Sequence, residues 1–281
     1  MKPYKGFNKD MTCQGFQYEE GKTYETNRAR CCFIGFHACE DPIDCLRYYG
    51  PDNSEYHEVE CEGQFDYFQR FRYNNGFACT KIKIGKKLNI IDIVNKTLKY
   101  RKEKRNLNTI KGYRKISCSM DEHGVSQTIG PHTISATTGD FSVSCTRIYD
   151  GIACSTGNFG ISYSTDTGNI SASTGVNGVS MVEGERGVSC ATGGWGYSDL
   201  KGNFGISCTT GRDGCSCVEQ SDCVAVAWGT NGKAKGATGS YLVLADWLGS
   251  DFKGAQMVRV DGKKIKANTW YTMVNGEIVE A

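Results

Sequence analysis

The chain has 281 residues and a formal net charge of +2, and hydrophobic residues make up 39% of it. Such a chain can bury a sizeable core, and its length favours two domains. No apolar run follows Met1 and no stretch approaches the length of a membrane span, so the sequence argues against a membrane protein and favours a cytoplasmic one.

Residues 1–84 predict a small α+β domain. Strands are expected in the segments PYKGFNK, GKTYET, YHEVECEG and FACTKIKIG. The segment GFHACEDPIDCLRYYG predicts a strand that leads into a helix. Asp41 would be the N-cap of this helix, Pro42 would occupy its first position, and Gly50 would lie just beyond its end.

Residues 85–115 predict a basic helical linker, because Leu88, Ile91, Val94 and Leu98 recur at helical spacing. The wider segment 81–115 holds thirteen basic and two acidic residues, a net charge of +11. A solvated helix face is the simpler interpretation. Nucleic-acid binding is the alternative, because phosphate contacts need clustered Lys and Arg. Its candidate residues are Lys99, Arg101, Lys102, Lys104 and Arg105.

Residues 116–232 repeat with a period of nine. The segment NFGISCTTG at Asn203 has a near copy, NFGISYSTD, at Asn158. Within each unit an apolar residue, a small one and again an apolar one alternate with a period of two, which predicts a strand. The flanking glycines predict tight turns. Stacked units of this kind form a β-solenoid.

Alternate repeats differ, so two of them should form one coil of eighteen residues with two unlike faces. One set is regular: Ile or Val is followed two residues later by Cys, Ala or Val. In the other set the residue type varies at the position two residues after the apolar one, which is occupied by Gln127, Cys145, Tyr163, Met181, Asp199 and Cys217. We expect the Ile/Val column to face the core, so Ile170→Asp should unfold the solenoid.

The fifteen cysteines raise the question of disulfides or a metal site. Six of them fall two residues after the Ile/Val column, and we expect this second column to point inward as small buried thiols. Without a secretion signal, the thiols should be reduced. The groups that could supply metal ligands are Cys215, Cys217 and Cys223, and Cys32, His37, Cys39 and Cys45. Neither has paired C-x-x-C spacing, so no metal is expected.

Residues 233–281 predict a β-hairpin cap over the open end of the solenoid. The dipeptides Asp261-Gly262 and Asn275-Gly276 are typical of two-residue hairpin turns, and each lies between expected strands. Trp247 and Trp270 would supply apolar bulk to this cap.

The first domain, with KGF near its start followed by GFHACEDPIDCLRYY, resembles an N-terminal domain found in phage and prophage proteins. In those proteins the domain often precedes repeats rich in Ser, Ala and Gly. The resemblance implies a phage setting, and therefore the host cytoplasm as the location, but it implies no particular activity.

The same domain also resembles ADP-ribosyltransferases of the poly(ADP-ribose) polymerase type. Lys5-Gly6 matches their His-Gly pair, and the strand at Gly35–Cys39 matches the one that carries their Tyr. The resemblance implies NAD or another nucleotide as cofactor, with Lys5 and His37 in the places of the clamping His and Tyr. The strand that should carry the catalytic Glu, residues 77–84, has no acid. Glu58 and Glu60 are the nearest residues that could replace this Glu. Because the expected acid is missing, the sequence leans against an enzyme.

We therefore expect an interaction protein that binds a host macromolecule through the solenoid, with inhibition of a host defence factor as one form of this function. The expected contact residues are Tyr163, Met181, Trp195, Tyr197 and Phe204. A nucleotide-binding enzyme of the ADP-ribosyltransferase kind and nucleic-acid binding through residues 81–115 are the alternatives. Self-association into a homo-oligomer stays open beside them.

Overall fold

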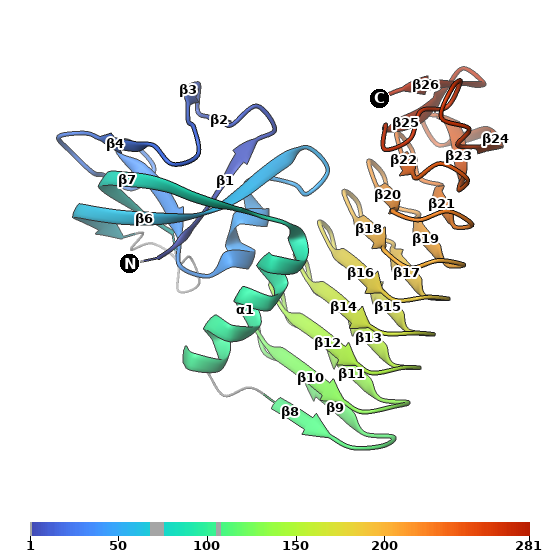
Figure 1. The fold of residues 1–281 in the computed structure, drawn as a ribbon, viewed down its shortest axis with the longest axis horizontal. Helices are drawn as coiled ribbons and strands as arrows, with labels where there is room; N and C mark the ends of the chain where they lie inside the picture. The colour runs from blue at the N-terminus through green and yellow to red at the C-terminus, as the bar shows by residue number, and fades with distance from the viewer. Residues whose placement is uncertain (1, 68–75, 105–107) are drawn as a thin grey trace. The chain divides into compact units, whose positions relative to one another are not determined.

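The computed structural model describes residues 2–67, 76–104 and 108–281 (Figure 1). The chain divides into two compact units, Met1–Asn106 and Leu107–Ala281. Helix α1 (Ile90–Lys104) belongs to the first unit, whereas the sequence predicts a separate linker at residues 85–115.

The first unit is built on one antiparallel sheet in the order β4-β7-β5-β1-β6, and β6 also pairs with β7. Strands β7, β5, β1 and β6 therefore close into a small ring. Aromatic and aliphatic side chains, including Phe7, Phe36, Phe77 and Ile82, fill it. The strands are β1 (Tyr4–Asn8), β2 (Thr12–Cys13), β3 (Phe16–Gln17), β4 (Thr23–Glu25), β5 (Phe36–Cys39), β6 (Ser54–Tyr67) and β7 (Gly76–Leu88).

The expected helix after β5 is present as a 3-10 helix, η1 (Pro42–Arg47). Its N-cap is Asp41, whose side chain accepts a hydrogen bond from the Ile43 backbone N–H. The second oxygen of Asp41 lies 2.7 Å from Nε of Arg101, on α1. The two side chains are 3% and 2% exposed, so this buried ion pair ties α1 to the first unit.

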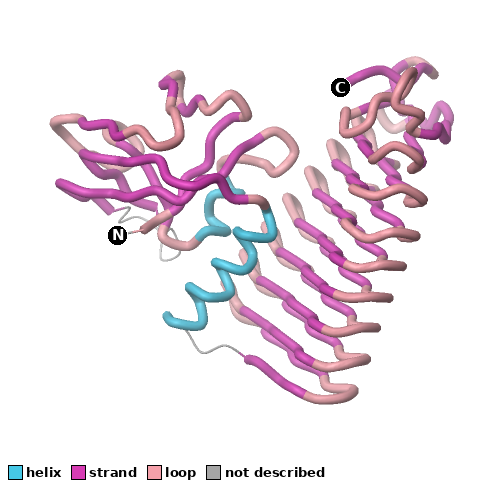
Figure 2. Tube along the Cα trace, in the orientation of Figure 1, coloured by secondary structure: helices cyan, strands magenta, loops and turns pink. Residues whose placement is uncertain are grey.

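The second unit is the predicted β-solenoid, in which the chain alternates between two parallel sheets (Figures 1 and 2). Val125 pairs with Val143 and Ile134 with Ile152, so each coil advances by eighteen residues. This confirms the predicted coil. The even strands are β8 (Asn108–Lys111), β10 (Val125–Ile129), β12 (Val143–Arg147), β14 (Ile161–Thr165), β16 (Val179–Glu183), β18 (Tyr197–Leu200), β20 (Cys215–Val218) and β22 (Lys233–Gly236). The odd strands are β9 (Ile116–Ser119), β11 (Ile134–Thr137), β13 (Ile152–Ser155), β15 (Ile170–Ser173), β17 (Val188–Ala191), β19 (Ile206–Thr209), β21 (Val224–Ala227) and β23 (Tyr241–Leu248).

The interior of the solenoid is lined by serine and not by isoleucine. Ser207 Oγ donates to Ser198 Oγ at 2.9 Å, and Ser216 Oγ donates to Ser207 Oγ at 2.8 Å, so the hydroxyls link one sheet to the other. All three serines are fully buried. Small side chains on both inner faces let the sheets approach closely, and the hydrogen bonds satisfy the buried hydroxyls.

Two expectations about the columns of the nine-stranded sheet, which contains the odd strands, are therefore wrong. Ile170 is 40% exposed, because Ser171 takes the inward position and the next residue in each direction along a strand must point outward. Ile170→Asp would therefore not place a charge in the core, so the reason to expect that it unfolds the solenoid no longer holds. The cysteines of this sheet also point outward, because they lie on the same side of the strands as the Ile/Val column. Cys118 is exposed, and Cys154, Cys190 and Cys208 are partly exposed.

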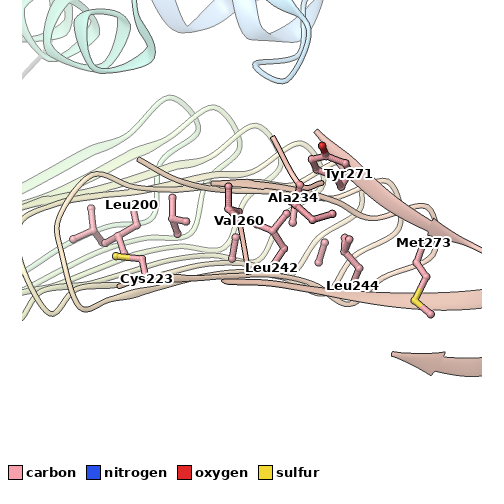
Figure 3. Close-up of a cluster of buried hydrophobic side chains, with 13 residues drawn as sticks. Leu200, Cys223, Ala234, Leu242, Leu244, Val260, Tyr271 and Met273 are labelled. Atoms are coloured by element: carbon pink, nitrogen blue, oxygen red, sulfur yellow. The ribbon is translucent and has the colours of Figure 1, made fainter. Parts of the chain in front are cut away.

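Toward the C-terminal end the interior becomes aliphatic. Val182, Leu200, Val218, Leu242 and Leu244 are fully buried in one cluster. Figure 3 shows side chains of this cluster between the two sheets. The solenoid also extends beyond its predicted limits, since β8 precedes residue 116 and β22 and β23 follow residue 232.

The cap consists of β24 (Asp251–Arg259), β25 (Tyr271–Val274) and β26 (Glu277–Glu280), which add antiparallel strands to the two sheets. The predicted hairpin at Asn275-Gly276 is present, with φ of 51° and 81° at these residues. The predicted hairpin at Asp261-Gly262 is wrong. The Asp261 carboxylate there accepts hydrogen bonds from the backbone N–H groups of Lys263 and Ile265, which shapes a loop instead.

Candidate functional site

A pocket of about 350 Å³ opens in the first unit, between the segments that carry β1 to β5. Its aromatic wall is formed by Phe16, Tyr18, Tyr24 and Phe36. Their rings meet edge to face, with centroids 4.8 Å apart for Phe16 and Tyr18 and 5.4 Å apart for Phe16 and Tyr24. The pocket is thus mainly apolar, with a small number of polar groups.

Lys5, on β1, is the buried cation of this pocket, with a side chain only 4% exposed. Its ammonium donates hydrogen bonds to the His37 carbonyl oxygen at 2.9 Å and to Cys13 Sγ at 3.3 Å. It also lies 5.4 Å from the ring centroid of Tyr18. All these partners are neutral groups.

His37, on β5, is the second polar group. Its Nε2 accepts a hydrogen bond from the Cys32 backbone N–H at 2.8 Å. Burial lowers the pKa of His37 below its ordinary value, and the positive charge of Lys5 lowers it further. The imidazole is therefore a neutral acceptor.

The structure brings together two of the four residues proposed for catalysis. Lys5 and His37 line one pocket. Glu58 and Glu60, on β6, do not line it: Glu58 forms an ion pair with Lys96 of α1, and Glu60 is exposed. Sequence reasoning missed Glu25, an acid on β4 that lines the pocket and lies 2.9 Å from Lys81. No motif around Glu25 signals this position.

A second candidate site is the outer surface of the nine-stranded sheet, which we call the apolar face. Its first column is Ile116, Ile134, Ile152, Ile170, Val188, Ile206, Val224 and Tyr241. Its second column is Cys118, Ala136, Cys154, Ala172, Cys190, Cys208, Val226 and Val243. A third column of exposed threonines follows beyond the strand ends: Thr138, Thr156, Thr174, Thr192 and Thr210.

Every residue of the first two columns of the apolar face is at least partly exposed, and none of the three columns carries a charged side chain. Ile116, Ile134 and Ile206 are 61%, 37% and 45% exposed. Isolated exposed apolar residues are ordinary on protein surfaces, whereas contiguous apolar patches are common at interaction surfaces.

The five residues expected to contact a partner fall into two groups. Tyr163, Met181 and Tyr197 are 2%, 1% and 7% exposed, so they offer no free surface in the structure. Trp195 and Phe204 are 55% and 63% exposed. Trp195 lies in the corner before β18 and Phe204 in the corner after it, so the two rings lie on opposite edges of the solenoid.

The residues expected to bind nucleic acid are also divided. Lys99, Lys102 and Lys104 are exposed on α1. Arg101 is buried in its ion pair with Asp41, so it cannot meet a phosphate without breaking that pair. Arg105 lies outside the described residues.

Across residues 2–67, 76–104 and 108–281, no cluster of three or more His, Cys, Asp or Glu side chains is arranged to hold a metal ion. Over the same ranges, none of the helices has both the length and the apolar character that crossing a membrane requires.

Taken together, these features define an α+β domain with an aromatic pocket, followed by a two-sheet β-solenoid with an exposed apolar face. Residues 1–96 match the model of a domain of unknown function, DUF7666. Comparison with curated proteins and with solved structures gave no match.

Proposed function

We propose that this chain acts by binding another protein and that the apolar face is its docking surface. The observation that carries the proposal is the uncharged Ile/Val column, which stays exposed over successive coils. The solenoid supports this surface on a continuous ladder of parallel strands, so binding requires little ordering of the backbone.

A second copy of the chain is the partner whose surface fits best. Side-chain rows on the apolar face repeat at the spacing of the strands, about 4.8 Å. A second apolar face has the same spacing, so the rows of the two copies can interdigitate along the whole face. A surface without this spacing would match only a few rows.

The size of the face agrees with such a pair. The nine-stranded sheet contributes eight strands of the solenoid, from β9 to β23. Eight strands about 4.8 Å apart, each with four residues of about 3.3 Å, give roughly 500 Å² per copy. A face-to-face pair would bury about 1,000 Å² in total, near the lower limit for specific interfaces.

A phage protein that acts on a host defence factor remains the setting that we propose for this scaffold. Its support is the resemblance of the first domain to phage and prophage proteins. Of the residues expected to contact such a target, Trp195 and Phe204 are the exposed ones. They lie at the edges of the solenoid and outside the three columns of the apolar face, so self-association would leave them available.

The test is the mass of the full-length protein in solution, measured by analytical ultracentrifugation over a range of micromolar concentrations. The wild type should dimerise. Ile170→Lys and Ile206→Lys place a charge on the apolar face and should give monomers that remain folded. Val176→Lys is the control, because Val176 is as exposed as Ile170, at 41% against 40%, but lies in a corner. A wild type that stays monomeric, or a dimer that tolerates both Ile variants, contradicts the proposal.

Thiol labelling gives a second measurement on the same samples. Cys154 and Cys190 are partly exposed on the apolar face, whereas Cys32 is exposed in the first unit. Maleimide labelling of Cys154 and Cys190 should slow as the protein concentration rises, and labelling of Cys32 should not. Equal rates at all concentrations would count against association through this face.

A further inference from the structure

We propose that the pocket of the first unit binds a small planar ring that carries one anionic group, a carboxylate or a phosphate. Lys5 would supply the counter-charge, and the aromatic wall would contact the ring. This inference concerns a different unit from the apolar face and does not depend on the protein partner.

Lys5 carries a buried charge that lacks an opposite charge beside it. A buried charge is costly unless it is paired with an opposite charge and hydrogen-bonded. Lys5 is 4% exposed, and none of its hydrogen-bond partners is charged. Among the described residues no carboxylate forms an ion pair with it. A ligand anion would provide the missing charge.

The acid that lines the same pocket does not provide it. Glu25 is 66% exposed, and its carboxylate lies 2.9 Å from the ammonium of Lys81. His37 adds no second positive charge, because burial and Lys5 keep its imidazole neutral. The pocket therefore has one buried cation, which favours a ligand with one anionic group.

The wall of the pocket suits a planar ring in both shape and chemistry. Phe16, Tyr18 and Tyr24 meet edge to face, which leaves ring surfaces and edges for a planar ligand to contact. Ligand pockets are typically apolar concavities of roughly 300–1,000 Å³ with a few polar groups that fix orientation. At about 350 Å³, this pocket matches the small end of that range and suits one ring with its substituent.

The experiment compares matched probes by calorimetric titration of the full-length protein. Benzoate and benzamide differ mainly in charge, whereas phenol is phenyl phosphate without its phosphate group, and the two pairs separate a carboxylate from a phosphate. In at least one pair the anion should bind tenfold or more tightly than its neutral counterpart. If neither pair discriminates, or if none of the four probes binds, the proposal is overturned.

Two variants locate the effect. Lys5→Met keeps the length of the side chain without its charge and should remove the preference for the anion. Lys9→Met is the control, since Lys9 is exposed and does not line the pocket; it should bind as the wild type does. A preference for the anion that survives in Lys5→Met overturns the assignment of Lys5. If Lys5→Met does not fold, the comparison of probes in the wild type decides alone.

Discussion

Two buried cations of the first unit have opposite surroundings. Arg101 lies against Asp41, and both side chains are almost fully buried. Breaking such a pair typically costs about 3–5 kcal/mol, because the remaining charge stays buried without a partner. Lys5 is buried among neutral groups. The first arrangement therefore fastens α1 to its unit, whereas the second leaves a positive charge available inside a pocket.

His37 should make the stability of the first unit depend on pH. Its pKa is lowered from 6.5, first by burial and then by Lys5. The unfolded chain therefore binds more protons than the folded one as the pH falls below about 6.5, so stability is lost on acidification through that range. Urea unfolding between pH 7.5 and 5 should show this loss, and His37→Gln should reduce it. Equal pH dependence in the wild type and in His37→Gln would refute the assignment.

At the scale of elements, the close stacking of coils depends on one column of glycines. A Cβ added to Gly157, Gly175 or Gly193 would lie 2.1–2.2 Å from the carbonyl oxygen of the glycine one coil earlier. No real Cβ approaches a carbonyl oxygen that closely, and the obstacle is backbone that cannot turn aside. The reason for glycine here is space between coils and not an unusual φ.

Two adjacent residues provide a matched test of this point. Gly193→Ala should destabilise the solenoid by roughly 1–3 kcal/mol or more, in the range of an overpacked core, because its Cβ would meet the Gly175 carbonyl oxygen at 2.1 Å. Gly194→Ala should have little effect, since the nearest atom would be 3.8 Å away. Chemical unfolding of both variants measures the difference. Similar stabilities would mean that neighbouring coils can move apart at little cost.

The sequence predicts the coil correctly because the Ile/Val positions keep one spacing from residue 116 onward. It does not predict which way they point. Alternation divides the residues of a strand into two sets that point to opposite faces, but it does not say which set faces the interior. We assumed that the apolar set faces the interior. Here the small set is inside, as the hydroxyl contacts between Ser198 and Ser207 show. The last coil departs from the eighteen-residue interval, because Val224 pairs with Tyr241, which lies one residue short of that interval.

The pocket was predictable only in part, for a similar reason. Lys5 and His37 were singled out from the sequence, and both line the pocket. Tyr24 and Glu25 reach it from β4, Phe16 from β3 and Tyr18 from the loop after β3. Short strands and loops of this kind follow tertiary packing and carry no periodic signal, so the sequence alone does not place them.

At the scale of the whole molecule, the eighteen-residue interval decides which deletions the solenoid tolerates, since Ile152 pairs with Ile170. Deleting residues 152–169 removes one complete coil, and each later strand should still join its own sheet. Deleting residues 152–160 removes half a coil and assigns each later strand to the opposite sheet. The first variant should keep the circular dichroism spectrum and cooperative unfolding of the wild type, and the second should lose both. A stable half-coil variant would show that the two sheets are interchangeable.

The serine-lined interior also has a thermal consequence. Exposure of apolar surface raises the heat capacity of unfolding, and exposure of polar surface lowers it. The coils from β10 to β20 bury a serine at an inward position in each even strand. Apolar side chains of the same strands, such as Val143, Ile161 and Met181, are buried on the other face of their sheet. Unfolding this region therefore exposes hydroxyl surface from the interior together with apolar surface. Its stability curve should be flatter than that of a solenoid of equal size with an aliphatic interior, with a smaller change in stability between cold and warm conditions.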